Sequence, residues 1–326
     1  MDIIIDLHRL ENETDFEWKL RLCKAKLNKD IDLDWSEIAE TLGLDVSADH
    51  LRKTAYGLIE YDNYIHGFEG VATTILSISD LHYPFAKPLD IFNEYSGKID
   101  ILQLNGDLID CMALSRFSKS YRVSPLEEMI GARQYIIDLI EMIKPKKVLV
   151  NHGNHELRLG SYLAKNLDNE LQELMPETAL DYIFIDGFTH YDRKTKAKVK
   201  YSPLCEVFDD MEIEYTGTWY SQYKDILFCH PKAFASSPLK TAEKALYWFR
   251  NEGFDFKNLI MSHTHRVGSY KIGNTMIYEQ GCCCETSKMR YNDGQLINSQ
   301  KEGFMIICLD KDGHVIEGRT HIKTLN

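Results

Sequence analysis

Polar side chains that bind metal ions and transfer protons occur at five places along the chain, each directly after an apolar run typical of a strand. In chain order the five groups are Asp80 and His82; Asp107 and Asp110; Asn154, His155 and Glu156; His230; and His263 and His265. Ligands of open α/β sheets bind beyond the carboxyl ends of the strands, so one fold could bring all five groups together.

The residue types in these groups suit divalent metals, because Asp, His and Asn side chains are good ligands for Mn, Fe, Zn or Ni. The spacing of two residues in Asp80/His82 and in His263/His265 places both side chains of each pair on one side of an extended segment. Two metal ions about 3.5–4 Å apart share a bridging carboxylate, clamp a phosphoryl group and activate water. Asp107 is the natural bridge.

Each group also has an ordinary explanation when it is taken alone. A single Asp-x-His is usually a turn, Gly-Asp before apolar residues usually caps a helix, and a lone histidine such as His230 is typically a hydrogen-bonded core residue. All of these explanations would have to hold together, in this order and after five separate strands. The combination therefore favours one metal site.

In this order the motifs resemble the signature of the calcineurin-like metallophosphoesterases, which is DxH, GD, GNH followed by an acid, a lone His, and GHxH. The resemblance covers about residues 72–320. One departure is Ser262, where the family usually has glycine before HxH. Because that position supplies backbone and no ligand in the family, we expect little consequence from the change.

The resemblance implies a role for each residue of the motifs. The implied ligands are Asp80, His82, Asp107 and His265 for a first divalent ion, and Asp107, Asn154, His230 and His263 for a second. Mn²⁺ is the expected metal, with Fe, Zn, Ni or Mg as alternatives. His155 is expected to protonate the leaving oxygen as general acid, oriented by either Glu156 or Asp110.

Other segments indicate which branch of the family the chain resembles. The serine/threonine protein phosphatases carry arginines where this chain has Cys111-Met112 and His152, and the repair nucleases usually have Asp where it has Glu156. Phosphoesterases of bacteriophages and prophages look most similar, through SDLHxPF and the later SRF. Two arginines, Arg116 and Arg158, are candidates for binding a substrate phosphate, with surface ion pairs as the alternative.

The elements that must position these residues lie beyond residue 70, where apolar runs alternate with helical segments. Strands are expected at 73–79, 99–105, 147–153, 225–230, 258–263, 274–280, 304–310 and 314–320, and helices at 87–96, 124–143, 156–174 and 238–252. The polar stretch 181–220 is expected to form a hairpin or a lid. With the resemblance, this pattern predicts an α/β fold, a two-sheet β-sandwich flanked by helices, over residues 71–326.

Residues 1–70 have a different character and are expected to form a small all-α module. Capped helices are predicted at 14–28, 34–43 and 47–62, and the last two resemble a helix-turn-helix. The module contains 16 acidic and 8 basic residues, for a charge of −8, whereas a reader of duplex DNA needs a basic face. Docking to DNA remains open, beside the alternative of a plain helical cap or a protein-docking module.

Composition excludes several classes of protein. The 326 residues carry a formal net charge of −12, which argues against a protein that coats polyanions. No apolar run approaches the roughly 20 residues of a membrane span, and the acidic N-terminus is unlike a secretory signal. The eight cysteines lack a CxxC pair and are expected to be reduced thiols. We therefore expect a cytoplasmic protein without a membrane partner.

These observations predict a phosphoesterase that uses two divalent metal ions. The expected substrate is a phosphodiester of nucleic acid, DNA or RNA, or of a nucleotide, hydrolysed by metal-activated hydroxide with His155 as the acid. The alternatives are a phosphomonoesterase acting on nucleotides or proteins, and a non-catalytic DNA-binding adaptor. The adaptor predicts erosion of the ligand set, and none of the expected ligands is missing.

Overall fold

The computed structural model describes residues 6–11, 13–66, 70–115, 122–192, 195–289 and 300–325. The chain divides into two compact units, Met1–Gly70 and Val71–Asn326. Within the described ranges, no helix is both long enough and apolar enough to cross a membrane.

The described residues of the first unit form three helices, α1 (Asp15–Leu27), α2 (Trp35–Thr41) and α3 (Ala48–His66). Thr14 begins α1 and Asp34 begins α2, each through a capping box that satisfies the free backbone amides of the first turn. One cluster of buried apolar side chains in the unit consists of Leu22, Cys23, Ile38, Ala39, Leu42, Leu51 and Ala55. The unit therefore has a hydrophobic core of its own, as the expected helical module requires.

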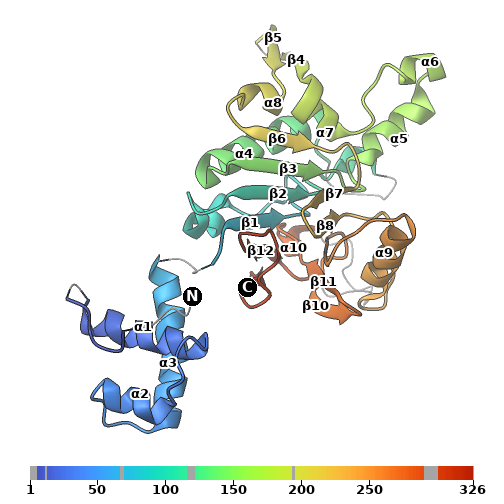
Figure 1. Ribbon diagram of the computed structural model, residues 1–326. Coiled ribbons are helices and arrows are strands. Elements are labelled where there is room, and N and C mark those ends of the chain that lie inside the picture. The colour runs from blue at the N-terminus through green and yellow to red at the C-terminus, as the bar shows by residue number, and fades with distance from the viewer. Residues whose placement is uncertain are drawn as a thin grey trace. The chain divides into compact units, whose positions relative to one another are not determined.

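The second unit is built on two large sheets (Figure 1). The six-stranded sheet has the order β13 (His321–Thr324), β12 (Gly303–Leu309), β1 (Thr73–Ile78), β2 (Ile101–Asn105), β3 (Lys147–Asn151) and β6 (Glu212–Tyr215). The five-stranded sheet has the order β10 (Val267–Ile272), β11 (Thr275–Gln280), β9 (Asn258–Met261), β8 (Ile226–Cys229) and β7 (Tyr220–Tyr223). Strands β1, β2, β3 and β6 are parallel to one another, as are β8, β9 and β11.

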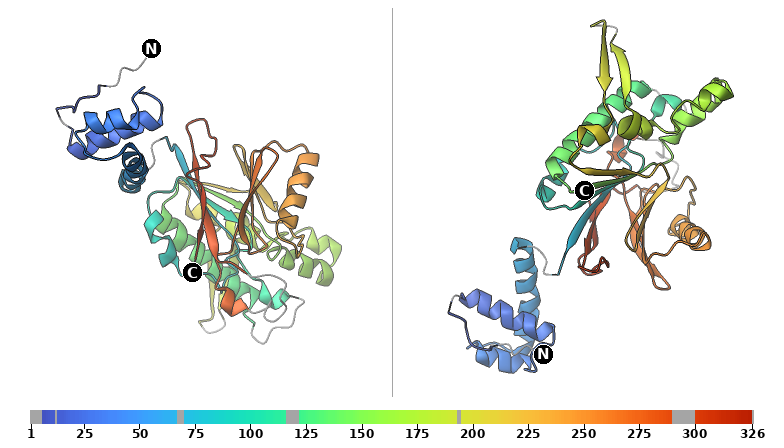
Figure 2. Two further views of the ribbon diagram at one scale, coloured as in Figure 1. Left: turned by 90° about the horizontal axis from the view of Figure 1, so that it is seen from below. Right: turned by 45° about the horizontal axis from the view of Figure 1, so that its top comes forward.

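The two sheets pack face to face, and helices cover their outer faces (Figure 2). The core between the sheets consists of Ile75, Ile101, Leu149, Ile226, Phe228, Ile260, Tyr278, Met305, Ile307 and Leu309. Helix α4 (Pro125–Ile143) packs on the six-stranded sheet and α9 (Lys240–Asn251) on the five-stranded sheet. The predicted α/β fold, a two-sheet sandwich flanked by helices, is confirmed.

Shorter elements connect these layers. They are η1 (Leu89–Tyr95), η2 (Met112–Leu114), α5 (Leu157–Asn166), α6 (Asn169–Gln172), α7 (Ala179–Asp181), η3 (Tyr182–Asp186), α8 (Leu204–Val207) and α10 (Thr286–Met289). The hairpin expected within 181–220 is present as β4 (Phe188–Asp192) and β5 (Ala197–Tyr201).

Two expected elements differ from the structure. The strand predicted at 314–320 is wrong, because the backbone N–H groups of Arg319 and Thr320 both donate to the Ile316 carbonyl oxygen and form a turn there. The last strand begins only at His321. The helix expected at 156–174 divides into α5 and α6, because Asp168 caps a new helix after Asn166.

Candidate metal centre

The five polar groups follow the carboxyl ends of five strands that lie in both sheets. Asp80 and His82 follow β1, Asp107 follows β2, and Asn154 and His155 follow β3. His230 follows β8 directly, and the pair His263 and His265 follows β9. The loops converge, because ligand atoms from different loops lie within 4.8 Å of one another.

The first part of the site contains Asp80, His82 and His265, whose ligand atoms lie within 4.8 Å of one another. Nε2 of His265 is 3.0 Å from Oδ1 of Asp80 and 3.2 Å from Nε2 of His82. All three side chains are almost completely buried. A carboxylate oxygen and two imidazole nitrogens directed at one another form a typical divalent-metal donor set.

The second part of the site contains Asp107, His230 and His263, again with ligand atoms within 4.8 Å. Oδ2 of Asp107 lies 3.2 Å from Nε2 of His230, and the same oxygen lies 3.7 Å from Nε2 of His82 in the first part. Asp107 therefore stands between the two groups of donors, where a bridging carboxylate is required.

Buried polar atoms without hydrogen-bond partners show that these residues fit metal ions. Among the described residues, Asn154 Oδ1, His230 Nε2 and His263 Nε2 are buried and have no hydrogen-bond partner. Leaving a buried polar atom unsatisfied costs about 1–3 kcal/mol. These are three of the second metal's four implied ligands, and coordination would satisfy all three atoms.

Backbone conformation also sets the site apart. Asp80, His82, Asp107, His263 and His265 all have left-handed φ values between 45° and 79°. Non-glycine residues rarely adopt this region, and each costs of the order of 1–3 kcal/mol, so such residues cluster where function requires the geometry. Five of the seven expected ligands are therefore held in strained loops by the surrounding sheets.

A second layer of contacts fixes the histidine rings. Nδ1 of His230 lies 2.9 Å from the Asn105 carbonyl oxygen and 2.9 Å from Oγ of Ser262. Nδ1 of His265 lies 3.0 Å from Nε2 of Gln300. These contacts leave Nε2 of both rings directed into the site. Position 262 thus supplies a side-chain contact to a ligand ring in addition to backbone.

His155 lies beside the carboxylates, and Asp110 orients it. Nδ1 of His155 is 2.9 Å from Oδ1 of Asp110, and Nε2 is 3.7 Å from Oδ2 of Asp107. Burial lowers the pKa of His155, against the opposing charge of Asp107. Of the two acids that the sequence left open as partners of His155, the structure places Asp110 against the ring.

Glu156 has a different task, since its carboxylate accepts hydrogen bonds from four backbone amides. Oε2 accepts from Asp107 and Gly153 at 3.1 and 2.8 Å, and Oε1 accepts from Leu108 and Ile109 at 2.6 and 3.1 Å. Burial and the charge of Asp107 raise its pKa to about 7. Glu156 therefore ties the loop after β2 to the loop after β3.

Comparison with known proteins shows which family has this arrangement of residues. The family model of calcineurin-like phosphoesterases matches residues 73–267, which is more than half of the chain. The chain belongs to the calcineurin-like phosphoesterase family. A comparison with curated proteins gives no match.

Several solved structures are similar to this calcineurin-like phosphoesterase. Vacuolar protein sorting 29 of Cryptosporidium parvum is 15% identical with a TM-score of 0.38, and the match covers 78% of this chain and 97% of that one. Wild-type Vps29 of Entamoeba histolytica, complexed with zinc, is 13% identical with a TM-score of 0.40, over 78% and 98%. A structure described as a novel archaeal phosphodiesterase is 13% identical with a TM-score of 0.36, over 78% and 100%.

The electrostatics of the phosphoesterase site favour cations. Burial raises the pKa of Asp80, but the His265 and His230 imidazoles outweigh it and hold that pKa below its usual value. Burial opposes charge on His82 and His230 as well, yet Asp110 and Asp107 raise their respective pKa values to about 9. The carboxylates are thus negative, and bound metal ions would take the place of the imidazole protons.

The two arginines predicted to bind phosphate have different outcomes. Arg116 lies outside the described residues. Arg158 donates from Nη1 to the Asp110 carbonyl oxygen at 2.7 Å, and its Nη2 lies 2.8 Å from Nε2 of His155. The guanidinium therefore lies at the site, where it can meet a substrate phosphate.

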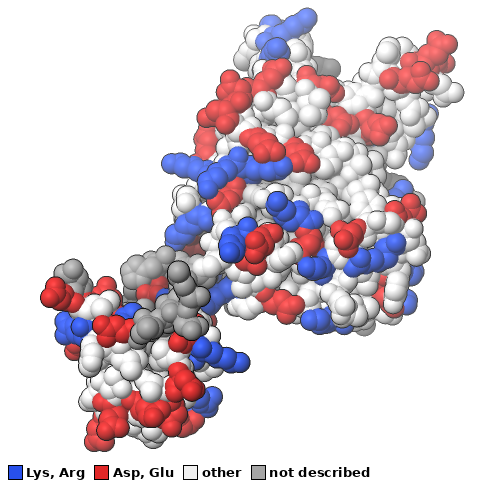
Figure 3. Space-filling view, viewed as in Figure 1, with Lys and Arg blue, Asp and Glu red and all other residues white. Residues whose placement is uncertain are grey.

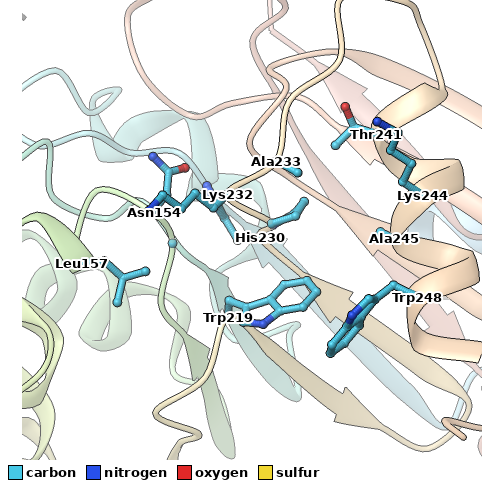
Figure 4. Close-up of a pocket in the computed structure, with 12 residues that line it drawn as sticks. Asn154, Leu157, Trp219, His230, Lys232, Ala233, Thr241, Lys244, Ala245 and Trp248 are labelled. Atoms are coloured by element: carbon cyan, nitrogen blue, oxygen red, sulfur yellow. The ribbon is translucent and has the colours of Figure 1, made fainter. Parts of the chain in front are cut away.

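Two hollows adjoin the phosphoesterase site. One, of about 430 Å³, is lined by Trp219, Trp248 and Lys244 together with His230 (Figure 4). The other, of about 400 Å³, is lined by Arg158, Ser161, Tyr162 and Lys165, with Leu114 and Ser115. Both include Asn154, Leu157 and Lys232, so the hollows meet beside the metal ligands. The tryptophans could not be connected from the sequence, because no motif joins Trp219, which precedes β7, to Trp248 of α9.

All eight cysteines are free thiols, as the sequence predicted. Cys282 and Cys284 lie near His265, with ligand atoms within 4.8 Å, whereas Cys283 belongs to the core under the six-stranded sheet. A hydrogen bond with Cys284 lowers the pKa of Cys282 to about 5. The two thiols thus belong to the surroundings of the first group of ligands.

Proposed function

We propose that this calcineurin-like phosphoesterase is a phosphodiesterase that acts on nucleic acid or nucleotides with two divalent metal ions. The observation that carries the choice of a diester is the meeting of two hollows beside Asn154. A phosphodiester has two organic groups, one for each hollow, whereas a phosphomonoester needs only one. The absence of the protein-phosphatase arginines at Cys111-Met112 and His152 supports the same choice.

Two bound divalent ions would supply hydroxide at neutral pH and neutralise the charge that develops on the phosphoryl group. The residues that would hold them are Asp80, His82, Asp107, Asn154, His230, His263 and His265. Mn²⁺ is the metal that we propose, since the donors combine imidazole nitrogens with carboxylate and amide oxygens.

The chain's own part in the reaction is to hold the phosphate and deliver a proton. Asp110 contacts Nδ1 of His155, so that Nε2 faces the site, and the doubly protonated ring would give its Nε2 proton to the leaving oxygen. Arg158 lies 2.8 Å from that nitrogen and would bind a phosphate oxygen on the same side. The leaving group is therefore expected on the side of the hollow that Arg158 lines.

The substrate class is tested by comparing bis(p-nitrophenyl) phosphate, p-nitrophenyl phosphate, and labelled single- and double-stranded DNA and RNA, each with Mn²⁺ and with chelator. We expect metal-dependent cleavage of the diester and of at least one nucleic acid. Cleavage of the monoester alone would establish the phosphomonoesterase instead. Absence of turnover on every substrate would leave the non-catalytic adaptor.

For the cellular setting we propose a cytoplasmic protein of phage or prophage type. The free thiols support a reducing compartment. The resemblance of residues 80–85 and 115–117 to phosphoesterases of phages supports the phage or prophage type.

For the N-terminal unit we propose docking to a macromolecular partner, with a protein favoured over DNA. The helix-turn-helix reading would place Arg52 and Lys53 of α3 toward DNA, but both basic groups pair with Asp49, at 3.0 and 2.6 Å. Acidic side chains also cover much of this unit's visible face (Figure 3). Both features oppose contact with a phosphate backbone.

This preference predicts that exchanging Arg52 and Lys53 for glutamate in the full chain leaves DNA affinity unchanged across salt concentrations. If α3 does contact DNA, the loss of two phosphate contacts would weaken binding and reduce the salt slope by about 2. Fluorescence anisotropy with labelled duplex at several salt concentrations distinguishes the two results. Weaker DNA binding by the variant, with a smaller dependence of affinity on salt concentration, would establish DNA as the partner.

A further inference from the structure

Trp219 and Trp248, which line the larger of the two hollows, belong neither to the expected metal ligands nor to the residues that move a proton. We propose that this cavity binds the nucleobase of a substrate nucleotide whose phosphate lies at the metal centre; this inference rests on the proposed phosphodiesterase function. Its volume of about 430 Å³ lies within the usual range of roughly 300–1,000 Å³ for small-molecule sites. Asn154 and His230 belong both to its lining and to the expected metal ligands. A group bound in the cavity is therefore adjacent to the reacting phosphate.

The position of Trp219 relative to the metal centre is fixed by the backbone. Its carbonyl oxygen accepts the backbone N–H of His230 at 2.8 Å and also contacts the side-chain amide of Asn151 at 3.4 Å. Phe249 supports the indole, with ring centroids 4.9 Å apart and an interplanar angle of 34°. The Trp219 ring is thus a rigid surface at a set place beside His230, as a stacking platform requires.

Trp248 extends this aromatic surface from α9. Its ring centroid lies 5.1 Å from that of Trp219, and the side chain remains 43% exposed. Figure 4 shows both indoles at one side of the cavity, with Leu157 at the other. A large aromatic side chain that stays exposed beside a hollow favours a planar ligand that would cover it.

The charges at the cavity select nucleotides among planar ligands. Lys232 and Lys244 line it, both exposed, and the described residues offer neither lysine a carboxylate partner. Lys232 also lines the second hollow, next to Arg158. Ammonium groups without partners, together with indole surfaces, match a base attached to phosphate, which is the combination used in binding single-stranded nucleic acids.

The test compares two diesters that share a p-nitrophenolate leaving group, thymidine 5′-(p-nitrophenyl phosphate) and methyl p-nitrophenyl phosphate. In both, the leaving group lies toward His155, so only the first diester places a base in the cavity. Base stacking predicts that Trp248→Ala raises KM for the thymidine ester by about tenfold. The same variant should leave kcat/KM for the methyl ester unchanged. Trp248→Phe should keep KM for the thymidine ester close to that of the unaltered protein.

Tyr247 provides the matched control, since it is the preceding residue of α9, is 53% exposed and does not line the cavity. Tyr247→Ala should therefore leave both esters unaffected. Because Trp248 is also exposed, its truncation removes little core packing, and thermal melting of both variants should match that of the unaltered protein.

A binding measurement separates failure of this inference from failure of the proposed function. Thymidine 5′-monophosphate and inorganic phosphate are titrated into the full chain by calorimetry, which requires no turnover. Tenfold weaker binding of the nucleotide to Trp248→Ala, with phosphate binding unchanged, supports the cavity even if neither diester is hydrolysed. The nucleobase site is overturned if Trp248→Ala hydrolyses each diester with the kcat/KM of the unaltered protein and binds the nucleotide equally tightly. That result would leave the proposed phosphodiesterase activity standing.

Discussion

Asp107→Asn is expected to lose most of the bound divalent metal and to reduce phosphodiester hydrolysis by on the order of 10³-fold or more. The reason is that Oδ2 of Asp107 lies between the two groups of donors, 3.2 Å from Nε2 of His230 and 3.7 Å from Nε2 of His82. An amide is neutral, so its oxygen is a much weaker bridge between two cations than a carboxylate oxygen. Metal ions at such sites supply several kcal/mol of charge stabilisation, which corresponds to a factor of this size.

Metal content per chain, measured by plasma mass spectrometry after dialysis, tests this prediction independently of any substrate. Asp225→Asn is a suitable control, because Asp225 pairs with Lys257 and His314 away from the site. We expect the control to retain the metal content of the unaltered protein. Equal metal content in Asp107→Asn would rule out the bridging role.

His155→Ala is expected to retain its metal but to reduce turnover by about 10²- to 10⁴-fold on substrates with poor leaving groups. The His155 ring is held through Nδ1 by Asp110, and it contributes no atom to the two groups of expected ligands. The backbone N–H of His155, which donates to Oδ1 of Asp107 at 2.8 Å, remains in the alanine variant. The loss should therefore fall on proton transfer alone.

The leaving group provides the discriminating measurement. A nucleoside alkoxide needs a proton as it departs, whereas p-nitrophenolate is stable as an anion. The His155→Ala defect should consequently be large for a dinucleotide and small for bis(p-nitrophenyl) phosphate. Equal defects on both substrates would contradict general-acid catalysis and indicate a role in binding.

The expected ligand set could be predicted because residue type and chain order both carry information. Asp80, Asp107 and Asn154 each follow a strand of a parallel set, and the carboxyl ends of parallel strands meet at one edge of a sheet. The alternation of apolar and helical segments predicted those strands. The convergence of the loops then follows from the fold, whatever the details of side-chain packing.

Finer assignments could not be predicted, since they depend on backbone conformation. Whether Glu156 or Asp110 orients His155 is decided by the loop at Asp107, whose φ is 52°. That loop directs four backbone amides, from residues 107–109 and 153, toward the Glu156 carboxylate. Asp110 is then the acid that remains for the ring. Sequence spacing alone contains no information on a left-handed residue of this kind.

The cavity beside the site was equally beyond sequence reasoning. Trp219 precedes β7 and Trp248 belongs to α9, and only the packing of that helix on the five-stranded sheet brings the two rings within 5.1 Å. The wrongly predicted strand at 314–320 has a local cause instead of a tertiary one. Its apolar pattern was suitable, but hydrogen bonds from the backbone N–H groups of Arg319 and Thr320 to the Ile316 carbonyl oxygen form a turn there.

The most direct test of the proposed function is a titration of the metal-free full chain with Mn²⁺, in which hydrolysis of bis(p-nitrophenyl) phosphate is followed. The donor sets around Asp107 predict no turnover in the chelated protein and full turnover once two equivalents are bound per chain. Turnover that persists in chelator, or that never appears at any Mn²⁺ concentration, would contradict a dinuclear phosphodiesterase.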